Sequence, residues 1–296
     1  MKRTPIIFPL FGCDALAYSI QKIGHYELGH STLHQFPDEE TVIKIESNVL
    51  ERTVIFITSL NLPNTKLLPL LFAAETARSL GAVRIILAAP YLAYMRQDKV
   101  FELGQGITST YFARLISHYF DGISTIDPHL HRWHALDEIY DIPTKVLHAT
   151  DNIADWIHKK IQKPLLIGPD AESMQWVEEI AQKLHAPYLV LEKNRIGDCD
   201  VEVSIPLIEQ YRDFIPCVCD DIISTGMTMM ETVKHLQLLN MPPPICIGIH
   251  ALFNTETEQN IKRAGAEKII TCNTILHSTN QIDITNIIAK GIIELC

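Results

Sequence analysis

The most informative run of residues is Ile215-Pro216-Cys217-Val218-Cys219-Asp220-Asp221-Ile222-Ile223-Ser224-Thr225-Gly226-Met227-Thr228. It predicts a buried strand, two carboxylates at the carboxyl end of that strand, a small polar turn and the start of a helix. In open α/β sheets, ligands bind beyond the carboxyl ends of the strands. Free N–H groups at the helix start and the hydroxyls of Ser224, Thr225 and Thr228 predict a cradle for an anion, which Gly226 lets the backbone approach closely.

The paired carboxylates of Asp220 and Asp221 indicate what kind of anion this turn would hold. They cannot bind phosphate themselves, but they can hold sugar hydroxyls or a magnesium ion beside it. A turn that binds phosphate on one side and a diol on the other is a ribose-phosphate site. An ordinary turn with Thr225 as the N-cap would explain Ser-Thr-Gly but not the acid pair before it. Gly-Lys-Ser/Thr is absent here, and no strand is followed by G-x-G-x-x-G, so Walker and dinucleotide loops are excluded.

Outside this run, short apolar segments alternate with segments of helical periodicity. Strands that are apolar on both faces and separated by helices indicate parallel sheets with helices on each side. The alternation pauses near Pro143 and starts again, which predicts two α/β domains, residues 1–147 and 148–296. The final predicted helix, Thr285–Glu294, could pack on either domain. The predicted strands are Ile6–Phe11, Thr53–Thr58, Arg84–Ala89, Gly122–Ile126, Leu165–Gly168, Tyr188–Leu191, Ile215–Cys219, Ile245–His250 and Lys268–Thr271. The other predicted helices are Asp14–Ile23, Lys66–Leu80, Thr108–His118, Ile153–Ile161, Ala171–Leu184, Thr228–Leu239 and Thr257–Ala264.

A second pattern interrupts the alternation near the start of the chain. The segments Ser31–Phe36 and Thr41–Ser47 alternate like strands and are joined by Pro37-Asp38-Glu39-Glu40. A short polar connection between two such segments predicts a β-hairpin. We expect this hairpin to form a flap added to the first sheet.

Composition bounds the possible functions. The chain has 296 residues, of which 47% are hydrophobic and 20% charged, and its formal net charge is −10. It is therefore too apolar for a disordered chain and too mixed for a membrane bundle. A chain this acidic is a poor general binder of nucleic acid, because phosphate contacts drive that affinity. Any anionic ligand would need a local cluster of cations, a metal ion, or both.

The cysteines and the apolar segments indicate a cytoplasmic protein. The seven cysteines are scattered without a C-x-x-C pair, so neither a disulfide framework nor a zinc ribbon is expected. The apolar run from Ile6 to Cys13 resembles a signal sequence, but it is short, is broken by Pro9 and lacks a small-residue cleavage site. No other apolar run reaches the roughly 20 residues that span a bilayer, so we expect no membrane partner.

The run at 215–228 resembles the phosphoribosyl-diphosphate (PRPP) loop of the phosphoribosyltransferase fold. Four other segments resemble motifs of the ribose-phosphate diphosphokinases, or PRPP synthases, in the order of that family. Variants at Pro128 and Ser224 and the short chain ends resemble its archaeal-type branch. The four segments are Phe36-Pro37-Asp38-Glu39-Glu40 (F-P-D-G-E, with Glu39 in place of glycine), Pro90–Lys99 (P-Y-x-x-Y-x-R-Q-D-R/K), Asp127-Pro128-His129 (D-L/P-H) and Lys193-Asn194-Arg195 (K-x-R).

This resemblance implies two tandem phosphoribosyltransferase-like domains and an enzyme that transfers the diphosphoryl group of ATP to the C1 hydroxyl of ribose 5-phosphate, with Mg²⁺ as cofactor. Lys193 and Arg195 would act on the transferring group, and His129 would face the phosphates or the magnesium ion. Asp170 would lie near the ribose or its metal, although a helix N-cap explains it equally well. The residues implied in ribose 5-phosphate binding are Asp220, Asp221, Ser224, Thr225, Gly226 and Thr228.

The resemblance also implies an ATP site. Phe36 would stack on adenine, Asp38 and Glu40 would accept hydrogen bonds from the nucleotide, and Arg96 and Gln97 would contact its phosphates or adenine. In the family this flap serves the ATP site of a neighbouring subunit, which implies a homo-oligomer with a dimer as its minimal unit. The histidines from His129 to His134 could share a zinc ion, but no cysteine completes such a set.

Three alternatives stay open. A non-catalytic regulatory subunit would keep the fold and lose catalytic residues. A PRPP-consuming phosphoribosyltransferase would have one such domain and a base-binding hood. A nucleotide-sensing role without catalysis is the third. Met227 and Ser224 depart from the common loop pattern, where glycine and aspartate are frequent.

Overall fold

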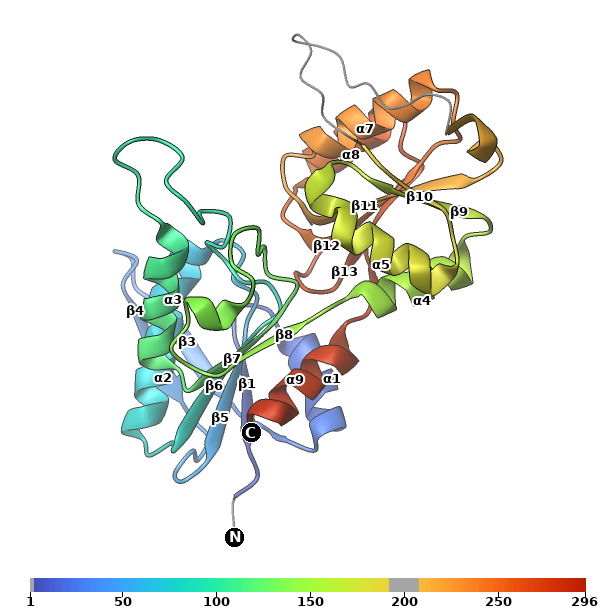
Figure 1. Cartoon of the computed structure of the whole chain (residues 1–296). Coiled ribbons are helices and arrows are strands. Elements are labelled where there is room, and N and C mark those ends of the chain that lie inside the picture. Colours follow the sequence, from blue (N-terminus) through green and yellow to red (C-terminus); the bar gives the residue numbers. More distant parts are fainter. Residues whose placement is uncertain (1–2, 192–207) are drawn as a thin grey trace. The chain divides into compact units, whose positions relative to one another are not determined.

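The computed structural model describes residues 3–191 and 208–296, which form two compact units (Figure 1). The first unit contains residues 1–148 and 285–296, and the second contains residues 149–284. The expected α/β fold class is confirmed, because each unit is a parallel sheet flanked by helices. The boundary lies within two residues of the expected one, but the last helix belongs to the first unit.

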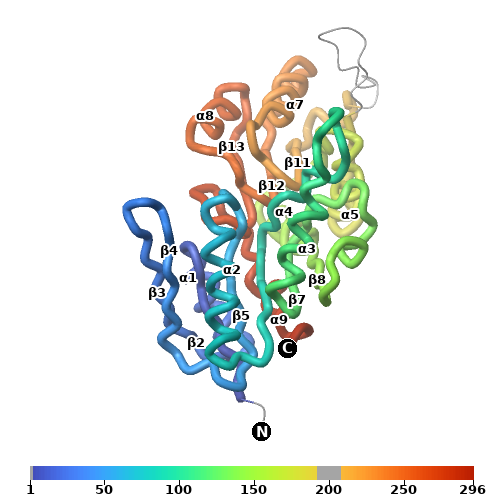
Figure 2. The backbone as a smooth tube through the Cα atoms, turned by 90° about the vertical axis from the view of Figure 1, so that its left-hand side faces the viewer, coloured from blue at the N-terminus to red at the C-terminus, as the bar shows by residue number. Residues whose placement is uncertain are grey.

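The first unit is built on a parallel sheet with the strand order β2-β1-β5-β6-β7-β8. Its strands are apolar on both faces, and Phe8 and Phe56 contact each other across neighbouring strands with ring centroids 5.6 Å apart. The helices α1 and α9 lie on one face and α2 and α3 on the other (Figures 1 and 2). The strands are β1 (Ile6–Pro9), β2 (Glu27–Leu28), β5 (Thr53–Ile57), β6 (Arg84–Ala89), β7 (Gly122–Ile126) and β8 (Thr144–Leu147). The helices are α1 (Asp14–Gly24), α2 (Pro63–Ser79), α3 (Thr108–Tyr119), the short 3₁₀ helix η1 (Leu136–Glu138) and α9 (Thr285–Leu295).

The last helix, α9, packs against α1 and against β6, β7 and β8. Its apolar residues Ile288 and Ile292 are fully buried. Gly291 permits the close approach, because a Cβ atom there would lie 2.5 Å from Ser124 Oγ and 2.6 Å from Leu147 Cδ1. The chain therefore returns to its first unit after completing the second.

The second unit repeats the same design with the order β10-β9-β11-β12-β13-β14. In it α4 and α5 pack together on one face of the sheet, and α7 and α8 on the other (Figure 2). The strands are β9 (Pro164–Gly168), β10 (Tyr188–Val190), β11 (Ile215–Ile223), β12 (Ile245–Ala251), β13 (Lys268–Cys272) and β14 (Asn280–Ile282). The helices are α4 (Thr150–Lys160), η2 (Ala171–Ser173), α5 (Met174–Leu184), η3 (Glu209–Tyr211), α7 (Met227–Leu238) and α8 (Thr255–Arg263).

Within each unit the strands follow one rule. The second strand in sequence lies at one edge, the first lies beside it, and the remaining four follow in order. The direction in which successive strands are added to the sheet therefore reverses between β1 and β5 in the first unit, and between β9 and β11 in the second. Crevices at such reversal points are where open α/β sheets bind ligands.

The predicted hairpin is present, but it is not part of the first sheet. The strands β3 (Ser31–Gln35) and β4 (Thr41–Ile45) pair with each other in antiparallel register and form a separate two-stranded sheet. The expectation that the flap extends the parallel sheet was therefore wrong. Its strand β4 packs instead against α2, so the hairpin lies over a helix.

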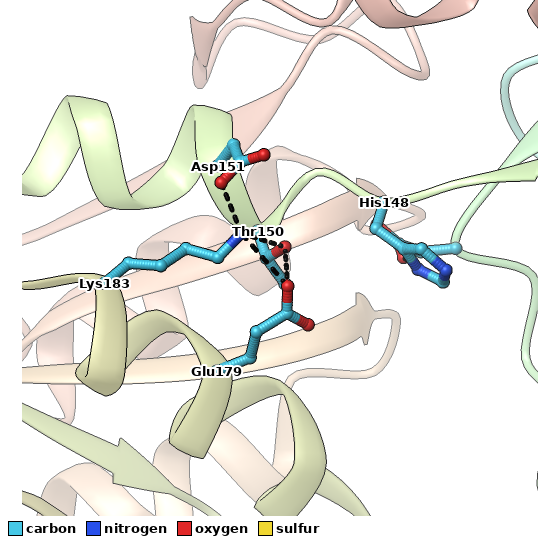
Figure 3. Close-up of polar contacts among 6 residues, drawn as sticks. His148, Thr150, Asp151, Glu179 and Lys183 are labelled. Atoms are coloured by element: carbon cyan, nitrogen blue, oxygen red, sulfur yellow. Dashed lines mark hydrogen bonds and ion pairs between the residues drawn. The ribbon is translucent and has the colours of Figure 1, made fainter.

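In the second unit, a polar network joins α4 to α5 (Figure 3). The buried Thr150 hydroxyl donates a hydrogen bond to Glu179 Oε1 at 2.7 Å. Lys183 on α5 forms ion pairs with Glu179, at 3.1 Å, and with Asp151. These contacts connect the start of α4 to the side of α5, so the helix that opens this unit is held by polar as well as apolar contacts. Over the described parts of the chain, no helix is both long and apolar enough to cross a bilayer.

Candidate active site

The reversal point of the second sheet brings together Asp170, which follows β9, and the acid pair on β11. The strand extends further than its apolar residues predicted. Its ladder with β12 continues from Cys217 to Ile223, where Ile223 pairs with Ala251. Asp220 and Asp221 therefore lie within the strand rather than after it, and the polar turn begins only at Ser224.

The three carboxylates affect one another. Burial raises the pKa of Asp220 well above its usual range, and repulsion from Asp221 and then from Asp170 raises it further. The Asp221 backbone N–H donates a hydrogen bond to Asp220 Oδ1 at 3.0 Å, which opposes this shift. A cation beside the three groups would relieve the repulsion, and carboxylate oxygens are the ligands that Mg²⁺ prefers. The donor set therefore fits a magnesium ion.

Asp170 is the N-cap of the short helix η2, which is the alternative that the sequence left open for this residue. Its Oδ1 accepts hydrogen bonds from the backbone N–H groups of Glu172, at 3.1 Å, and Ser173, at 3.2 Å. The Asp170 backbone N–H completes the capping box by donating to Ser173 Oγ at 3.4 Å, and the Ser173 hydroxyl also donates to the Asp170 carbonyl at 2.6 Å. Gly168 leaves room for this cap, because a Cβ atom there would lie 2.5 Å from Ser173 Oγ. The cap orients a carboxylate whose charge still reaches Asp220, so both roles coexist.

The turn after β11 requires a glycine for two reasons. Gly226 has φ +73°, the left-handed conformation that glycine adopts without strain, at the N-cap of α7. A Cβ atom there would also lie 2.7 Å from Thr257 Cγ2 and 2.9 Å from Ile261 Cδ1, both on α8. The expected close approach of a ligand is therefore accompanied by close packing of α8 against the turn.

The hydroxyls of this turn differ in their surroundings. Thr225 Oγ1 accepts a long hydrogen bond from the Met227 N–H at 3.4 Å, while Ser224 and Thr228 are half-buried. The helix begins at Met227, one residue before the expected start. The Met227 side chain is 59% exposed, so its bulk lies largely in solvent. The long capping bond leaves the N-terminal N–H groups of α7 available to an anion.

In the first unit, the hairpin tip holds the residues expected to bind nucleotide. Phe36, Asp38 and Glu40 are all exposed, and the Phe36 ring meets His34 edge to face at 4.7 Å. Asp38 Oδ1 accepts the Glu40 N–H at 3.2 Å. Glu39 has φ +71° at the position where the family motif carries glycine. Glu39 therefore adopts the left-handed backbone conformation that favours glycine.

Arg96 and Gln97 lie in an irregular segment between β6 and α3. Arg96 is exposed, and the Gln97 carbonyl accepts the backbone N–H of Ser109 at the start of α3, at 3.2 Å. The buried Asp98 pairs with Arg132 Nε at 3.8 Å. The helix α3 begins only at Thr108, the expected residue, so Arg96 and Gln97 lie before it.

The Asp127–His129 triplet is held by a contact that sequence analysis did not single out. Asp127 is fully buried and has a φ of +36°. Its Oδ1 atom lies 2.7 Å from Nδ1 of His148. His129 Nδ1 and His131 Nε2 are 3.1 Å apart, so these two side chains interact with each other. His148 is 21 residues from Asp127, and no motif or periodicity links the two positions.

The predicted catalytic pair, Lys193 and Arg195, lies outside the described residues. The predicted metal-binding roles of His129 and Asp170 stay predictions.

Comparison with known families supplies the remaining observation. A model of the N-terminal domain of ribose phosphate pyrophosphokinase matches residues 6–119, and a phosphoribosyl transferase domain model matches residues 135–285. The chain belongs to the ribose-phosphate pyrophosphokinase family. Both models match in tandem along the chain, whereas a phosphoribosyltransferase alone would account for one domain.

Individual members of the ribose-phosphate pyrophosphokinase family match at similar length. The chain is 29% identical over 261 residues to a ribose-phosphate pyrophosphokinase of Saccharolobus solfataricus, covering 85% of this chain and 86% of the relative. It is 27% identical over 287 residues to ribose-phosphate pyrophosphokinase 2 of Archaeoglobus fulgidus, covering 97% and 99%. Both relatives are archaeal, in agreement with the expected branch.

The solved structures add a whole-chain match of fold. The phosphoribosylpyrophosphate synthetase of Mycobacterium smegmatis superposes with a TM-score of 0.85, covering 99% of each chain at 20% sequence identity. Tandem domains of this fold are therefore confirmed along the whole chain.

Proposed function

We propose that the protein is a ribose-phosphate diphosphokinase, which transfers the diphosphoryl group of ATP to ribose 5-phosphate and forms PRPP and AMP. The observation that carries this proposal is the reversal point of the second sheet. There, a glycine-containing turn at a helix start lies beside three carboxylates. The turn at 224–228 binds the 5-phosphate, and Asp220 and Asp221 hold the ribose hydroxyls.

In the proposed reaction, the C1 hydroxyl oxygen forms a bond to the β-phosphorus of ATP. The bond from that phosphorus to the oxygen bridging to the α-phosphorus breaks, AMP leaves with the bonding electrons, and the hydroxyl proton passes to solvent. Such transfers depend on positioning and on stabilising charge at phosphoryl oxygens. We assign this stabilisation to Lys193 and Arg195, whose compact ammonium and planar guanidinium are complementary donors.

The carboxylates of the second unit support Mg²⁺ as the cofactor. Asp170, Asp220 and Asp221 offer hard oxygen ligands, and the raised pKa of Asp220 marks repulsion that a cation would relieve. Asp170 and His129 are each assigned a role in magnesium binding. When bound, Mg²⁺ neutralises charge on the phosphates of ATP. The protein's own residues then align the C1 hydroxyl with the β-phosphorus.

ATP binding is assigned to the first unit. Phe36 is exposed at the hairpin tip, where its face is available for stacking on adenine, and Asp38 and Glu40 lie beside it. Arg96 supplies an exposed cation, and Gln97 an amide group, from the segment after β6.

We also propose that the protein is a homo-oligomer with a dimer as its minimal unit. The hairpin and α2 carry exposed apolar residues, and β4 and α2 together line a cavity of about 380 Å³. Among its lining residues, Val42, Phe72 and Leu80 are 43–50% exposed. Light scattering during gel filtration should give at least twice the mass of one chain, and Phe72→Asp should reduce that mass. A monomeric wild-type protein would contradict this proposal.

The cytoplasm is the proposed compartment. Six cysteines lie among the described residues, and all six are free thiols. Reduced cysteines, several of them buried, are typical of a protein from a reducing compartment.

The activity is tested by measuring AMP release from ATP, with and without ribose 5-phosphate and Mg²⁺. AMP formation that requires both the sugar phosphate and the metal supports the proposal. Diphosphate release from PRPP that requires a base would instead indicate a phosphoribosyltransferase. ATP binding without any turnover would indicate a regulatory subunit or a nucleotide sensor.

A further inference from the structure

The first sheet has its own reversal point, which corresponds by strand order to the one that carries the acid cluster in the second. It lies between β1 and β5, where the chain turns into α1 and α2. The residues that connect β5 to α2 are Thr58-Ser59-Leu60-Asn61-Leu62, and they contain no carboxylate. The chemistry of the first crevice therefore differs from that of the second.

The charged side chain that contacts this connection is a lysine. Lys66, in the first turn of α2, donates hydrogen bonds from Nζ to the Ser59 carbonyl at 2.8 Å and to Asn61 Oδ1 at 2.7 Å. The same ammonium lies 5.9 Å from the centre of the Phe11 ring, in the turn after β1. Lys66 therefore lies between the segment that follows β5 and the turn that follows β1.

Among the described residues, no carboxylate forms an ion pair with the Lys66 ammonium. Its two hydrogen-bond acceptors are a neutral carbonyl and a neutral amide. A cation in the first turn also opposes the helix macrodipole, whose N-terminal end is positive. Burial lowers the pKa of Lys66, a further sign that the charged form is costly here.

The neighbouring thiol does not supply the missing charge. Cys13 interacts electrostatically with Lys66, but burial raises the pKa of this thiol above its usual value. It is therefore neutral at physiological pH. The acid nearest to Cys13 in sequence, Asp14, is exposed in the first turn of α1. An anion from solution is the group that would balance Lys66 at this crevice.

We propose that the crevice between β1 and β5 binds a tetrahedral oxyanion of the phosphate class, held by the Lys66 ammonium. Two of its three N–H donors are used by Ser59 and Asn61, which aim the group and leave one donor for the ligand. The first-turn N–H groups of α1 and α2 add to the positive potential. The residues of this site belong to the first unit and the ribose-phosphate turn to the second, and the existence of the site does not depend on the proposed activity.

The site is tested by soaking crystals in selenate, a tetrahedral oxyanion that anomalous diffraction locates directly. The expected result is a peak within hydrogen-bond distance of Lys66 Nζ in the wild-type protein. Lys66→Gln should abolish this peak, because it keeps polarity and loses the charge. Lys159→Ala, which removes an exposed lysine on α4 of the second unit, should leave it in place. Absence of the peak in the wild type, or its persistence in Lys66→Gln, would overturn the proposal.

Solution binding provides the second measurement. Titration calorimetry with inorganic phosphate should show that Lys66→Gln weakens one binding event by about tenfold or more, while Lys66→Arg restores it. Methyl phosphate in place of phosphate distinguishes a site for phosphate esters from one for the free ion. Melting temperatures of both variants identify any loss of folding. Equal phosphate binding by folded Lys66→Gln and wild type would contradict the assignment, whatever the outcome of the AMP assay.

Discussion

At Asp220, burial and the charges of Asp221 and Asp170 all raise the pKa, so the folded protein favours the neutral acid. Between the ordinary aspartate pKa, about 4, and this raised value, the folded state binds more protons than the unfolded chain. The free energy of unfolding therefore falls as pH rises through that window and stays reduced above it. The carboxylate is retained at a cost to stability, as is common for groups with a function in binding.

We predict that Asp220→Asn makes the unliganded protein more stable than the wild type at neutral pH, with a melting temperature higher by a few degrees. The difference should vanish below about pH 4, where both states protonate the wild-type group. Denaturation across a pH series measures it, and turnover should be lost in the same variant. The exposed Asp213 in the same unit gives the control Asp213→Asn. A stability difference that does not change with pH would contradict this prediction.

Gly226 combines a left-handed backbone with close contacts, and the two effects can be separated. Gly226→Ala is expected to destabilise the protein by about 2–4 kcal/mol, since it adds overpacking against α8 to backbone strain. Gly104 has φ +92° with no atom within 4 Å of a built Cβ, so Gly104→Ala incurs backbone strain alone, about 1–2 kcal/mol. Urea denaturation of both variants measures the difference. Equal losses would show that packing against Thr257 and Ile261 contributes little.

Lys193 and Arg195 are predicted to act on the migrating diphosphoryl group rather than on ATP binding. Lys193→Ala and Arg195→Ala should each lower kcat by about 10²–10³-fold and change the KM for ATP much less. Steady-state AMP release measures both constants. The exposed Lys159 on α4 provides the control Lys159→Ala. Unchanged turnover in both loop variants would contradict the mechanism.

At the level of elements, the α4–α5 network offers a contrast between a buried and an exposed contact. Thr150 is 1% exposed, so Thr150→Val should cost about 1–2 kcal/mol by removing the bond to Glu179. Asp151 pairs with Lys183 at the surface, and Asp151→Asn should cost less than about 1 kcal/mol. Chemical denaturation of the two variants measures both. A larger loss for Asp151→Asn would show that the network depends on the exposed ion pair.

The sequence predicted elements well where apolar residues form long runs. The strands β5, β6 and β7 start at the expected residues, because each run is apolar on both faces. It missed β2, β8 and β14, which are short and gain their place by pairing with a strand already in the sheet. The predicted end of β11 was also too early. Asp220 and Asp221 have the polarity of turn residues, whereas the hydrogen-bonded ladder with β12 continues past them.

The candidate site was predictable in part for the same reason. Local motifs identify Asp220, Asp221 and the 224–228 turn, because these residues are adjacent in sequence. The contact between Asp127 and His148 joins distant positions and depends on the pairing of β7 with β8. Likewise, Lys66 looked like the first residue of a helix, and its lack of an ion-paired carboxylate among the described residues is visible only in three dimensions.

At the level of the whole molecule, the strand order is the same in both units although their crevices differ in charge. One crevice gathers carboxylates and the other presents a lysine. The topology therefore sets where ligands can bind, and the residues at each reversal point set which ligands those are.

The position of α9 leads to a prediction about fragments. Residues 1–148 alone lack the helix that packs against α1 and against β6, β7 and β8, so they should bind the dye ANS and be cleaved rapidly by protease. A fragment with residues 285–296 joined to 148 through a glycine-serine linker should resist both. Equal protease resistance of the two fragments would show that α9 is dispensable for the first unit.

The return of α9 also fixes an order of events during synthesis on the ribosome. Domains commonly fold from the N-terminus as the chain emerges. Here the twelve residues that close the first sheet, 285–296, are translated after every strand of the second sheet. The N-terminal half therefore keeps one apolar face open until the second unit has been synthesised, and the nascent polypeptide presents an apolar surface to chaperones throughout that interval.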